Sequence, residues 1–198
     1  MTVSMAPVRA ICFDLDNTLW DVWPVIQRAE QAMYDYLAER CPRIVAVHTV
    51  ETMREARQRT ATLYPQMKHD FTFLRLQALR DHARDFGYAQ TLANEAFDVF
   101  MRARNEVELY EDATAALEEL KSRYRLFTAS NGNADLTKIG IAHFFERSVA
   151  ARQVGALAGE PVAVAAVLHQ PRRAKLLQPG VQGVGRDAAN AVLQQAKG

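Results

Sequence analysis

The chain has 198 residues, of which 49% are hydrophobic, and its 24 basic and 23 acidic side chains leave a net charge of +1. A length of this order suggests one main domain with room for an insert, and this hydrophobic fraction can form a sizeable core. The near-neutral charge gives no reason to expect a nucleic-acid partner or binding to an anionic membrane surface.

The first predicted element is a short buried strand over residues 8–13, where only Arg9 interrupts an apolar run. Two aspartates, Asp14 and Asp16, follow it directly. Burying two carboxylates so close together is costly unless a cation or a proton offsets their repulsion. A divalent metal would do so, and hard oxygen ligands suit Mg²⁺.

This pair of carboxylates predicts chemistry at phosphorus. Asp14 is a candidate nucleophile whose attack gives an aspartyl-phosphate. Asp16 is a candidate general acid and base, which protonates the leaving alkoxide and later activates water. Thr18 can donate a hydrogen bond to a phosphate oxygen or fix the turn. The alternative is a plain strand followed by a capped turn, because Asp-x-Asn-Thr is also common turn chemistry.

Residues 21–106 show helical periodicity and no convincing strand, and therefore form a helical insert. Helices are predicted from Pro24 to Cys41, over 49–63, from about Phe71 to Gly87, and from Leu92 to about Glu106. Four aromatic residues have two possible roles, lining a substrate pocket or, more commonly, packing in a core or interface: Trp20, Trp23, Tyr64 and Phe71.

The chain then returns to α/β character. Asp112 is predicted to cap a helix, and a strand over 124–129 runs into Ser130-Asn131-Gly132. A hydroxyl at a strand end, followed by a glycine turn, can bind an anion through its side chain and backbone N–H groups. Asn-Gly alone is weak evidence, since it occurs in many turns. Further strands are predicted at 147–151 and 181–184.

Asp14, Asp16 and Thr18 after a strand resemble the first motif of the haloacid dehalogenase (HAD) superfamily, and Ser130 with its Asn-Gly turn resembles the second. The second aspartate resembles the phosphatase branch, because true dehalogenases lack it. The resemblance also implies that the backbone carbonyl of Asp16 binds Mg²⁺ beside the carboxylate of Asp14.

The same resemblance implies the fold and the domain division. The expected class is α/β, with a Rossmann-like core of mostly parallel strands and the site at their carboxyl ends. The core domain would comprise residues 1–20 and 107–198, and residues 21–106 would be an all-helical cap that covers the site, excludes water and contacts the leaving group. The alternative for residues 21–106 is a helical subdomain with no gating role.

The C-terminal region departs from the family pattern. Ala158 stands where the family has a lysine, and Arg186 and Ala191 stand at metal-ligand positions, beside which only Asp187 survives. Losing one such preorganised charge commonly costs about 10²–10³ in rate. Asp187 could rotate in as a ligand, and four residues could replace the lysine's charge, although a solvated turn is the commoner role for the last three: Arg152, Arg172, Arg173 and Lys175.

Two functions therefore remain open. The first is a Mg²⁺-dependent phosphatase of a small phosphorylated metabolite, and the second is a HAD-fold binding or interaction protein with impaired or absent catalysis. Carbon–halogen hydrolysis is disfavoured because it needs neither a metal nor Asp16. The predicted site comprises catalytic Asp14 and Asp16, phosphate-binding Thr18, Ser130, Asn131 and Gly132, and the metal ligands Asp14, Asp16 and Asp187.

Cysteine content and hydropathy give the expected setting. Two cysteines, Cys12 and Cys41, make no disulfide framework and fit a reducing, cytoplasmic compartment. Residues 1–10 carry no signal-peptide pattern, and no apolar run has the length of a membrane span. None of the five histidines shows metal-ligand spacing. The sequence leaves the oligomeric state open.

Overall fold

The computed structural model describes residues 8–155. Its sheet has three parallel strands in the order β1-β2-β3, namely β1 (Ala10–Phe13), β2 (Arg125–Ser130) and β3 (Arg147–Ala150). The predicted α/β class with parallel strands is confirmed. The strand predicted at 181–184 lies outside the described residues.

The strand boundaries differ slightly from those predicted. Val8 and Arg9 are exposed and precede β1. In β2 the ladder reaches Ser130, so this residue ends the strand instead of following it. β3 ends at Ala150 because Ala151 begins the short helix α8 (Ala151–Val154).

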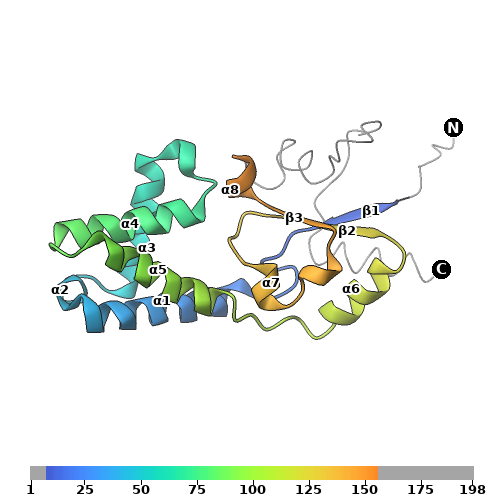
Figure 1. Ribbon diagram of the computed structural model, residues 1–198, viewed down its shortest axis with the longest axis horizontal. Helices are drawn as coiled ribbons and strands as arrows, with labels where there is room; N and C mark the ends of the chain where they lie inside the picture. Colours follow the sequence, from blue (N-terminus) through green and yellow to red (C-terminus); the bar gives the residue numbers. More distant parts are fainter. Residues whose placement is uncertain (1–7, 156–198) are drawn as a thin grey trace.

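A helical insert, here defined as residues 22–104, separates β1 from β2 (Figure 1). Within it, α1 and α5 lie side by side, α4 packs against α5, and α3 packs against α4. Its elements are α1 (Val22–Arg40), α2 (Pro42–Val45), α3 (Val50–Leu63), the 3₁₀ turn η1 (Pro65–Met67), α4 (Phe71–Asp85) and α5 (Gln90–Arg104). The insert has a hydrophobic core of its own, which includes Met33, Leu37, Ile44, Leu79 and Phe100.

Side-chain caps fix where the long helices of the insert begin. Asp21 accepts a hydrogen bond from the backbone N–H of Trp23 at 3.0 Å, and Asp70 accepts one from that of Phe73 at 2.9 Å. Thr49 caps α3 in a reciprocal arrangement with Thr52. Each of these polar residues therefore marks the start of a separate helix.

Three further elements complete the described chain around the sheet: α6 (Ala113–Lys121), α7 (Leu136–Ile139) and the 3₁₀ turn η2 (Ala142–Phe144). Asp112 occupies the N-cap position of α6, as predicted, but its side chain makes no capping hydrogen bond. Its backbone is already helical, with φ −88° and ψ −11°, whereas a side-chain cap requires an extended residue.

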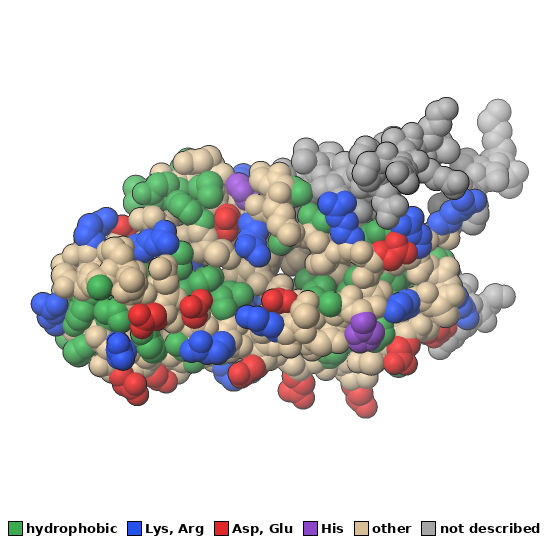
Figure 2. All heavy atoms as spheres, in the orientation of Figure 1, with side chains coloured by type: hydrophobic (Ala, Val, Ile, Leu, Met, Phe, Trp, Pro, Cys, Tyr) green, Lys and Arg blue, Asp and Glu red, His purple; other side chains and the backbone are tan. Residues whose placement is uncertain are grey.

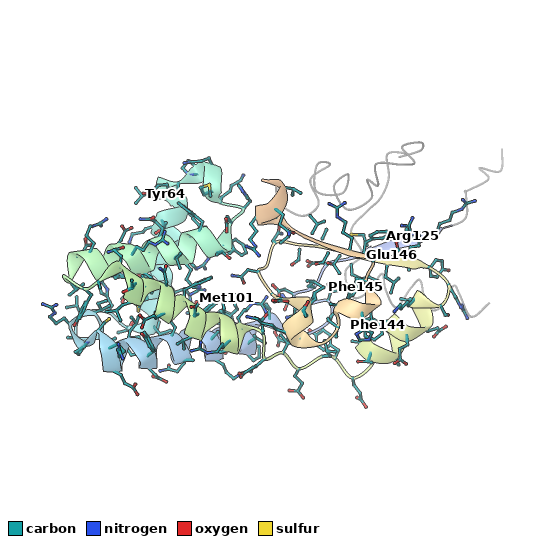
Figure 3. The ribbon with its side chains drawn as sticks, viewed as in Figure 1. Tyr64, Met101, Arg125, Phe144, Phe145 and Glu146 are labelled. Atoms are coloured by element: carbon teal, nitrogen blue, oxygen red, sulfur yellow. The ribbon has the colours of Figure 1, made fainter. Side chains whose placement is uncertain are left out.

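Aromatic packing joins this second half of the core to β1. Phe13 meets Phe145 edge to face, with 6.1 Å between ring centroids. Figure 3 shows Phe144 and Phe145 beside the strands, with Arg125 and Glu146 near them. Those two form an exposed ion pair between β2 and the residue before β3, at 2.6 Å. These contacts join the strands to the segment that precedes β3 and so help to fix the loops at the strand ends.

Two chain segments connect the sheet to the helical insert, and they are bridged to each other. The backbone N–H of Tyr110 donates to the carbonyl of Leu19 at 2.9 Å, and Trp20 forms an isolated bridge with Leu109. Trp20 is completely buried in the core around the sheet. The loop after β1 is therefore fixed at both ends. In the described part of the chain, no helix is long and apolar enough to cross a membrane.

Candidate active site

The strand register brings Asp14 and Ser130 together. β1 and β2 are parallel, and Phe13 is the partner of Thr128. Asp14 therefore follows β1 at a point where β2 continues for two more residues, and Ser130 lies close enough to its carboxylate to lower the pKa of that group. The Ser130 oxygen accepts a hydrogen bond from the backbone N–H of Gly132 at 3.0 Å. The two predicted motifs thus meet at the carboxyl edge of the sheet.

The half-buried carboxyl group of Asp14 has a perturbed pKa. Burial raises this pKa, and the nearby charge of Asp16 raises it further, whereas hydrogen bonds from the Leu15 backbone and the Ser130 hydroxyl lower it. The net direction is upward. A cation bound close to Asp14 would favour the ionised form, which is the nucleophilic one.

Asp16 is held by three hydrogen bonds from two residues. The Nη2 atom of Arg104 lies 2.6 Å from Oδ1 and 2.8 Å from Oδ2, and the indole Nε1 of Trp20 donates to Oδ1 at 2.9 Å. The side chain of Arg104 is 1% exposed and that of Asp16 is 23% exposed. The sequence argument required a cation to offset the paired carboxylates, and for Asp16 the described structure supplies an arginine.

Only glycine fits at position 132, because Asp16 and Arg104 lie directly against it. A Cβ atom built on it would lie 2.5 Å from Oδ2 of Asp16 and 3.2 Å from Nη2 of Arg104. Contacts under 3.0 Å are essentially unknown for a real Cβ, so any side chain here would displace the Asp16 carboxylate. The turn after β2 therefore approaches Asp16 through backbone alone.

Arg104 is the site residue that sequence reasoning missed. It ends α5, and its separation of 88 residues from Asp16 gives no local pattern. A weak signal existed, because Ala93, Ala96, Phe100 and Arg104 share the buried face of α5. A charged residue on such a face must find a partner, since burying an unpaired charge is costly. Its Nη1 atom is buried and has no hydrogen-bond partner among the described residues.

Of the other predicted site residues, Thr18 and Asn131 lie in the turns after β1 and β2, and Asp187 is outside the described residues. Thr18 is half-buried in the turn after β1, where its backbone N–H donates to the Leu15 carbonyl at 3.1 Å. Asn17, just before it, has a φ of +62°, a conformation that asparagine tolerates. Asn131 is half-buried in the turn that leads to Gly132. Asp187 lies outside the described residues, as do Ala158 and Arg186.

The four aromatic residues divide between the two roles considered. Trp20 is buried core. Tyr64 packs edge to face on Phe73, with ring centroids 5.3 Å apart. Trp23 and Phe71 are 51% and 38% exposed, so both keep surface that a ligand can contact.

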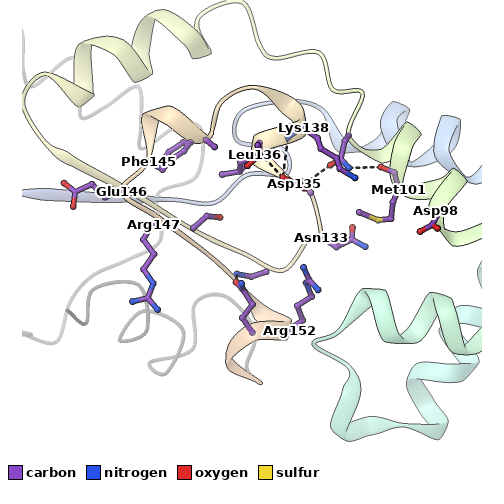
Figure 4. Close-up of a pocket in the computed structure, with 17 residues that line it drawn as sticks. Asp98, Met101, Asn133, Asp135, Leu136, Lys138, Phe145, Glu146, Arg147 and Arg152 are labelled. Atoms are coloured by element: carbon purple, nitrogen blue, oxygen red, sulfur yellow. Dashed lines mark hydrogen bonds between the residues drawn. The ribbon is translucent and has the colours of Figure 1, made fainter. Parts of the chain in front are cut away.

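A cavity of about 540 Å³ adjoins the turn that follows Ser130 (Figure 4). Asp98 and Met101 of α5 line one side of it, and residues of β3 and α8, including Arg152, line another. Asn133 lies at its edge and donates to the Thr72 hydroxyl of α4 at 3.2 Å. Arg152, one predicted substitute for the missing lysine, is thus beside the turn. The other candidates, residues 172, 173 and 175, lie outside the described residues.

The described residues fit a divalent cation only in part. The carboxylate of Asp14 and the backbone carbonyl of Asp16 offer two hard oxygen ligands. Within residues 8–155, no group of three or more His, Cys, Asp or Glu side chains could hold a metal ion. Asp187, the third predicted ligand, lies outside this range.

Comparison with known families decides the assignment. A family model described as haloacid dehalogenase-like hydrolase matches residues 8–172. The chain belongs to the haloacid dehalogenase-like hydrolases. The predicted resemblance is thereby confirmed, and the three-stranded sheet with its inserted helices is the described part of a HAD-like fold.

Known members of this hydrolase family include both phosphatases and dehalogenases. YigB of Escherichia coli K12, a 5-amino-6-(5-phospho-D-ribitylamino)uracil phosphatase, is 27% identical over 143 residues, which cover 70% of this chain and 60% of YigB. A 2-haloacid dehalogenase from Pseudomonas syringae pv. tomato DC3000 is 36% identical with a TM-score of 0.71, over 76% of this chain and 66% of the other.

A more distant structure, the L-2-haloacid dehalogenase PA0810, shares the fold with a TM-score of 0.53 at 21% identity, over 81% of this chain and 69% of that one. This hydrolase thus spans less than two thirds of YigB and of the Pseudomonas dehalogenase.

Proposed function

We propose that this HAD-like hydrolase is a Mg²⁺-dependent phosphatase of a small phosphorylated metabolite and that it works through an aspartyl-phosphate. The observation that carries the proposal is the meeting of Asp14, Asp16 and Ser130 at one edge of the parallel sheet. The phosphatase name of the E. coli relative supports it, and so does the second aspartate. The Pseudomonas dehalogenase supports the competing carbon–halogen chemistry.

In this mechanism Asp14 attacks phosphorus. The Ser130 hydroxyl and the backbone N–H groups of the 131–132 turn bind phosphoryl oxygens, which requires the hydrogen bond from the Gly132 N–H to the Ser130 oxygen to break. Thr18 contributes a further hydrogen bond from the loop after β1. The carboxylate of Asp14, the carbonyl of Asp16 and Asp187 would hold Mg²⁺, which when bound stabilises negative charge on the phosphoryl oxygens. The helical insert, with the residues that flank it, forms a cap domain over residues 21–106. Residues 1–20 and 107–198 form the core domain.

Asp16 needs freedom to act as acid and base. An aspartate ion-paired to Arg104 has no proton to give, so protonating the leaving alkoxide requires its carboxylate to separate from the guanidinium. Because Arg104 ends α5, a small displacement of the insert relative to the loop after β1 would release Asp16. The cap and the acid are thus linked in the proposed cycle.

The second candidate, a HAD-fold binding protein with impaired catalysis, rests on the same pair of residues. Arg104 contacts both oxygens of Asp16, and the site lacks a third acidic ligand within the described residues. If Arg104 never releases Asp16, the protein binds a phosphorylated molecule without turning it over.

Hydrolysis of p-nitrophenyl phosphate with and without Mg²⁺, by the wild type and by Asp14→Asn, tests the proposal. Metal-dependent turnover that disappears in Asp14→Asn supports the phosphatase. Turnover of neither this ester nor a panel of phosphorylated metabolites, in a folded protein, favours the binding protein. Chloride release from 2-chloropropionate without metal, again lost in Asp14→Asn, would instead establish a dehalogenase.

A further inference from the structure

A cluster of three arginines surrounds one buried glutamate inside the helical insert. Glu30 of α1 is 2% exposed; its Oε2 accepts from Arg54 of α3 at 2.6 Å and its Oε1 from Arg75 of α4 at 3.1 Å. Arg57, one turn after Arg54 on α3, interacts electrostatically with the same glutamate. We call Arg54, Arg57 and Arg75 the arginine cluster.

The arginine cluster has more positive charge than Glu30 can balance. Glu30 carries one negative charge, and each of its oxygens already accepts a hydrogen bond. The Nε atom of Arg57 is buried without a hydrogen-bond partner among the described residues. Burial lowers the pKa of Arg57 and lowers that of Arg75 to about 10, although Glu30 acts in the opposite direction on both. An anion placed here would be stabilised.

Aromatic rings lie against these guanidinium groups. Arg75 stands over Phe100 at 3.8 Å from the ring centroid, Arg54 over Trp23 at 5.2 Å, and Arg57 over Phe71 at 6.0 Å. Trp23 and Phe71 are the two partly exposed aromatic residues noted above. These cation–π contacts help to hold the guanidinium groups in place.

Two short paths of contacts connect the arginine cluster to the proposed active site. Arg75 packs on Phe100, which lies one turn before Arg104 on α5, and Arg104 pairs with Asp16. Phe71, under Arg57, is followed by Thr72, which accepts the hydrogen bond from Asn133 in the turn after Ser130. Figure 1 shows the start of α4 close to α8 of the core. The cluster therefore belongs to the part of the insert that approaches the site.

We propose that the arginine cluster binds a second anionic group of the substrate, a carboxylate or a further phosphate, while the first phosphoryl group meets Asp14. This inference rests on the proposed function and narrows its substrate class to metabolites with two anionic groups. Arg57 is the specificity residue, because its Nε has no hydrogen-bond partner within residues 8–155. Arg54 and Arg75 are already engaged by Glu30 and set the position of the site.

Binding of non-hydrolysable phosphonates to the full chain tests this inference independently of turnover. The series is methylphosphonate, which has one anionic group, followed by phosphonoacetate, 3-phosphonopropionate and 4-phosphonobutyrate, which add a carboxylate at increasing reach. Methylenebisphosphonate replaces the carboxylate with a second phosphonate. Calorimetric titrations compare the wild type, Arg57→Gln and Arg57→Lys. The matched control is Arg59→Gln, which removes the same charge from a side chain of α3 that is 62% exposed.

We expect the wild type to bind at least one two-anion ligand about 10- to 100-fold more tightly than methylphosphonate, as one added charge-assisted contact implies. Arg57→Gln should lose this preference for a second anionic group, and Arg57→Lys should recover part of it. Arg59→Gln should match the wild type.

Equal affinity of wild type and Arg57→Gln across the series overturns the inference, and so does a wild type with no preference for a second anionic group. An Arg57-dependent preference in a protein that hydrolyses no phosphate ester upholds the inference and refutes the phosphatase. Whether carboxylate or phosphonate gains more from Arg57 identifies the second group.

Discussion

Arg104 holds both carboxylate oxygens of Asp16 through one nitrogen, at 2.6 and 2.8 Å, and so joins the last turn of α5 to the loop after β1. The pair links the helical insert directly to the proposed acid–base residue. Asp16 is held between this guanidinium and the backbone of Gly132, with the Trp20 indole as a further donor. Figure 2 shows basic and acidic side chains of the described residues mixed over the visible face, with no large patch of one sign. The Arg104–Asp16 pair is therefore the charge interaction on which the first prediction rests.

A double-mutant cycle should reveal the coupling of this pair. Asp16→Asn leaves Arg104 buried without its counter-charge, and we expect it to lower the free energy of unfolding by about 2–3 kcal/mol, since Asp16 itself is partly solvated. Arg104→Gln in the Asp16→Asn background should cost much less than it does in the wild type. Urea unfolding of the four proteins measures the coupling. Additive effects would contradict the proposed link.

Gly132→Ala should lower both activity and stability, because it displaces the Asp16 carboxylate. Its Cβ would meet Oδ2 of Asp16 at 2.5 Å and push the carboxylate away from Arg104. We expect kcat on a phosphate ester to fall about 100-fold, as for the loss of one preorganised group. Gly140→Ala is the control, because Gly140 has a φ of +90° but no atom within 4 Å of a built Cβ. It should cost about 1 kcal/mol of stability and leave kcat unchanged.

Glu30→Gln should destabilise the helical insert. It removes the carboxylate that Arg54 and Arg75 share and leaves the buried cations uncompensated, at a cost of about 3–5 kcal/mol in unfolding free energy. Adding Arg75→Met, which also keeps an apolar side chain against Phe100, should restore much of that loss. Thermal and urea unfolding follow both variants. A Glu30→Gln protein as stable as the wild type would show that the arginines need no counter-charge.

His82 should make the protein sensitive to mild acid. Burial, with a contribution from His48, lowers the pKa of His82 from 6.5 to about 4. Between pH 6.5 and pH 4, His82 is therefore protonated in the unfolded chain but largely neutral in the folded protein. The free energy of unfolding falls as the pH drops through this range. This loss should reach about 1–2 kcal/mol at pH 5.

His82→Gln removes the titrating group, so its stability between pH 7 and pH 5 should change less than that of the wild type. His143→Gln replaces an exposed histidine and should retain the full wild-type dependence. Urea midpoints at the two pH values are the measurement. If His82→Gln loses as much stability in acid as the wild type does, then another group controls the response.

The sequence by itself determined the local features of this protein. The apolar run before Asp14, the strand that leads to Ser130 and the helical periodicity between them all reflect interactions among neighbours. The elements predicted within residues 8–155 appear within a few residues of their expected positions. The two motifs also carried enough local pattern to indicate the family, and parallel strands then required their residues to meet at one edge of the sheet.

Only the tertiary structure decided which charges pair. Arg104 reaches Asp16 across 88 residues, and Glu30 is buried between arginines from two other helices. Neither contact follows from spacing, because each depends on how α1, α4 and α5 pack and on where the connecting segments place them. Periodicity shows that a charged residue lies on a buried face, but only packing in three dimensions selects the partner that makes its burial tolerable.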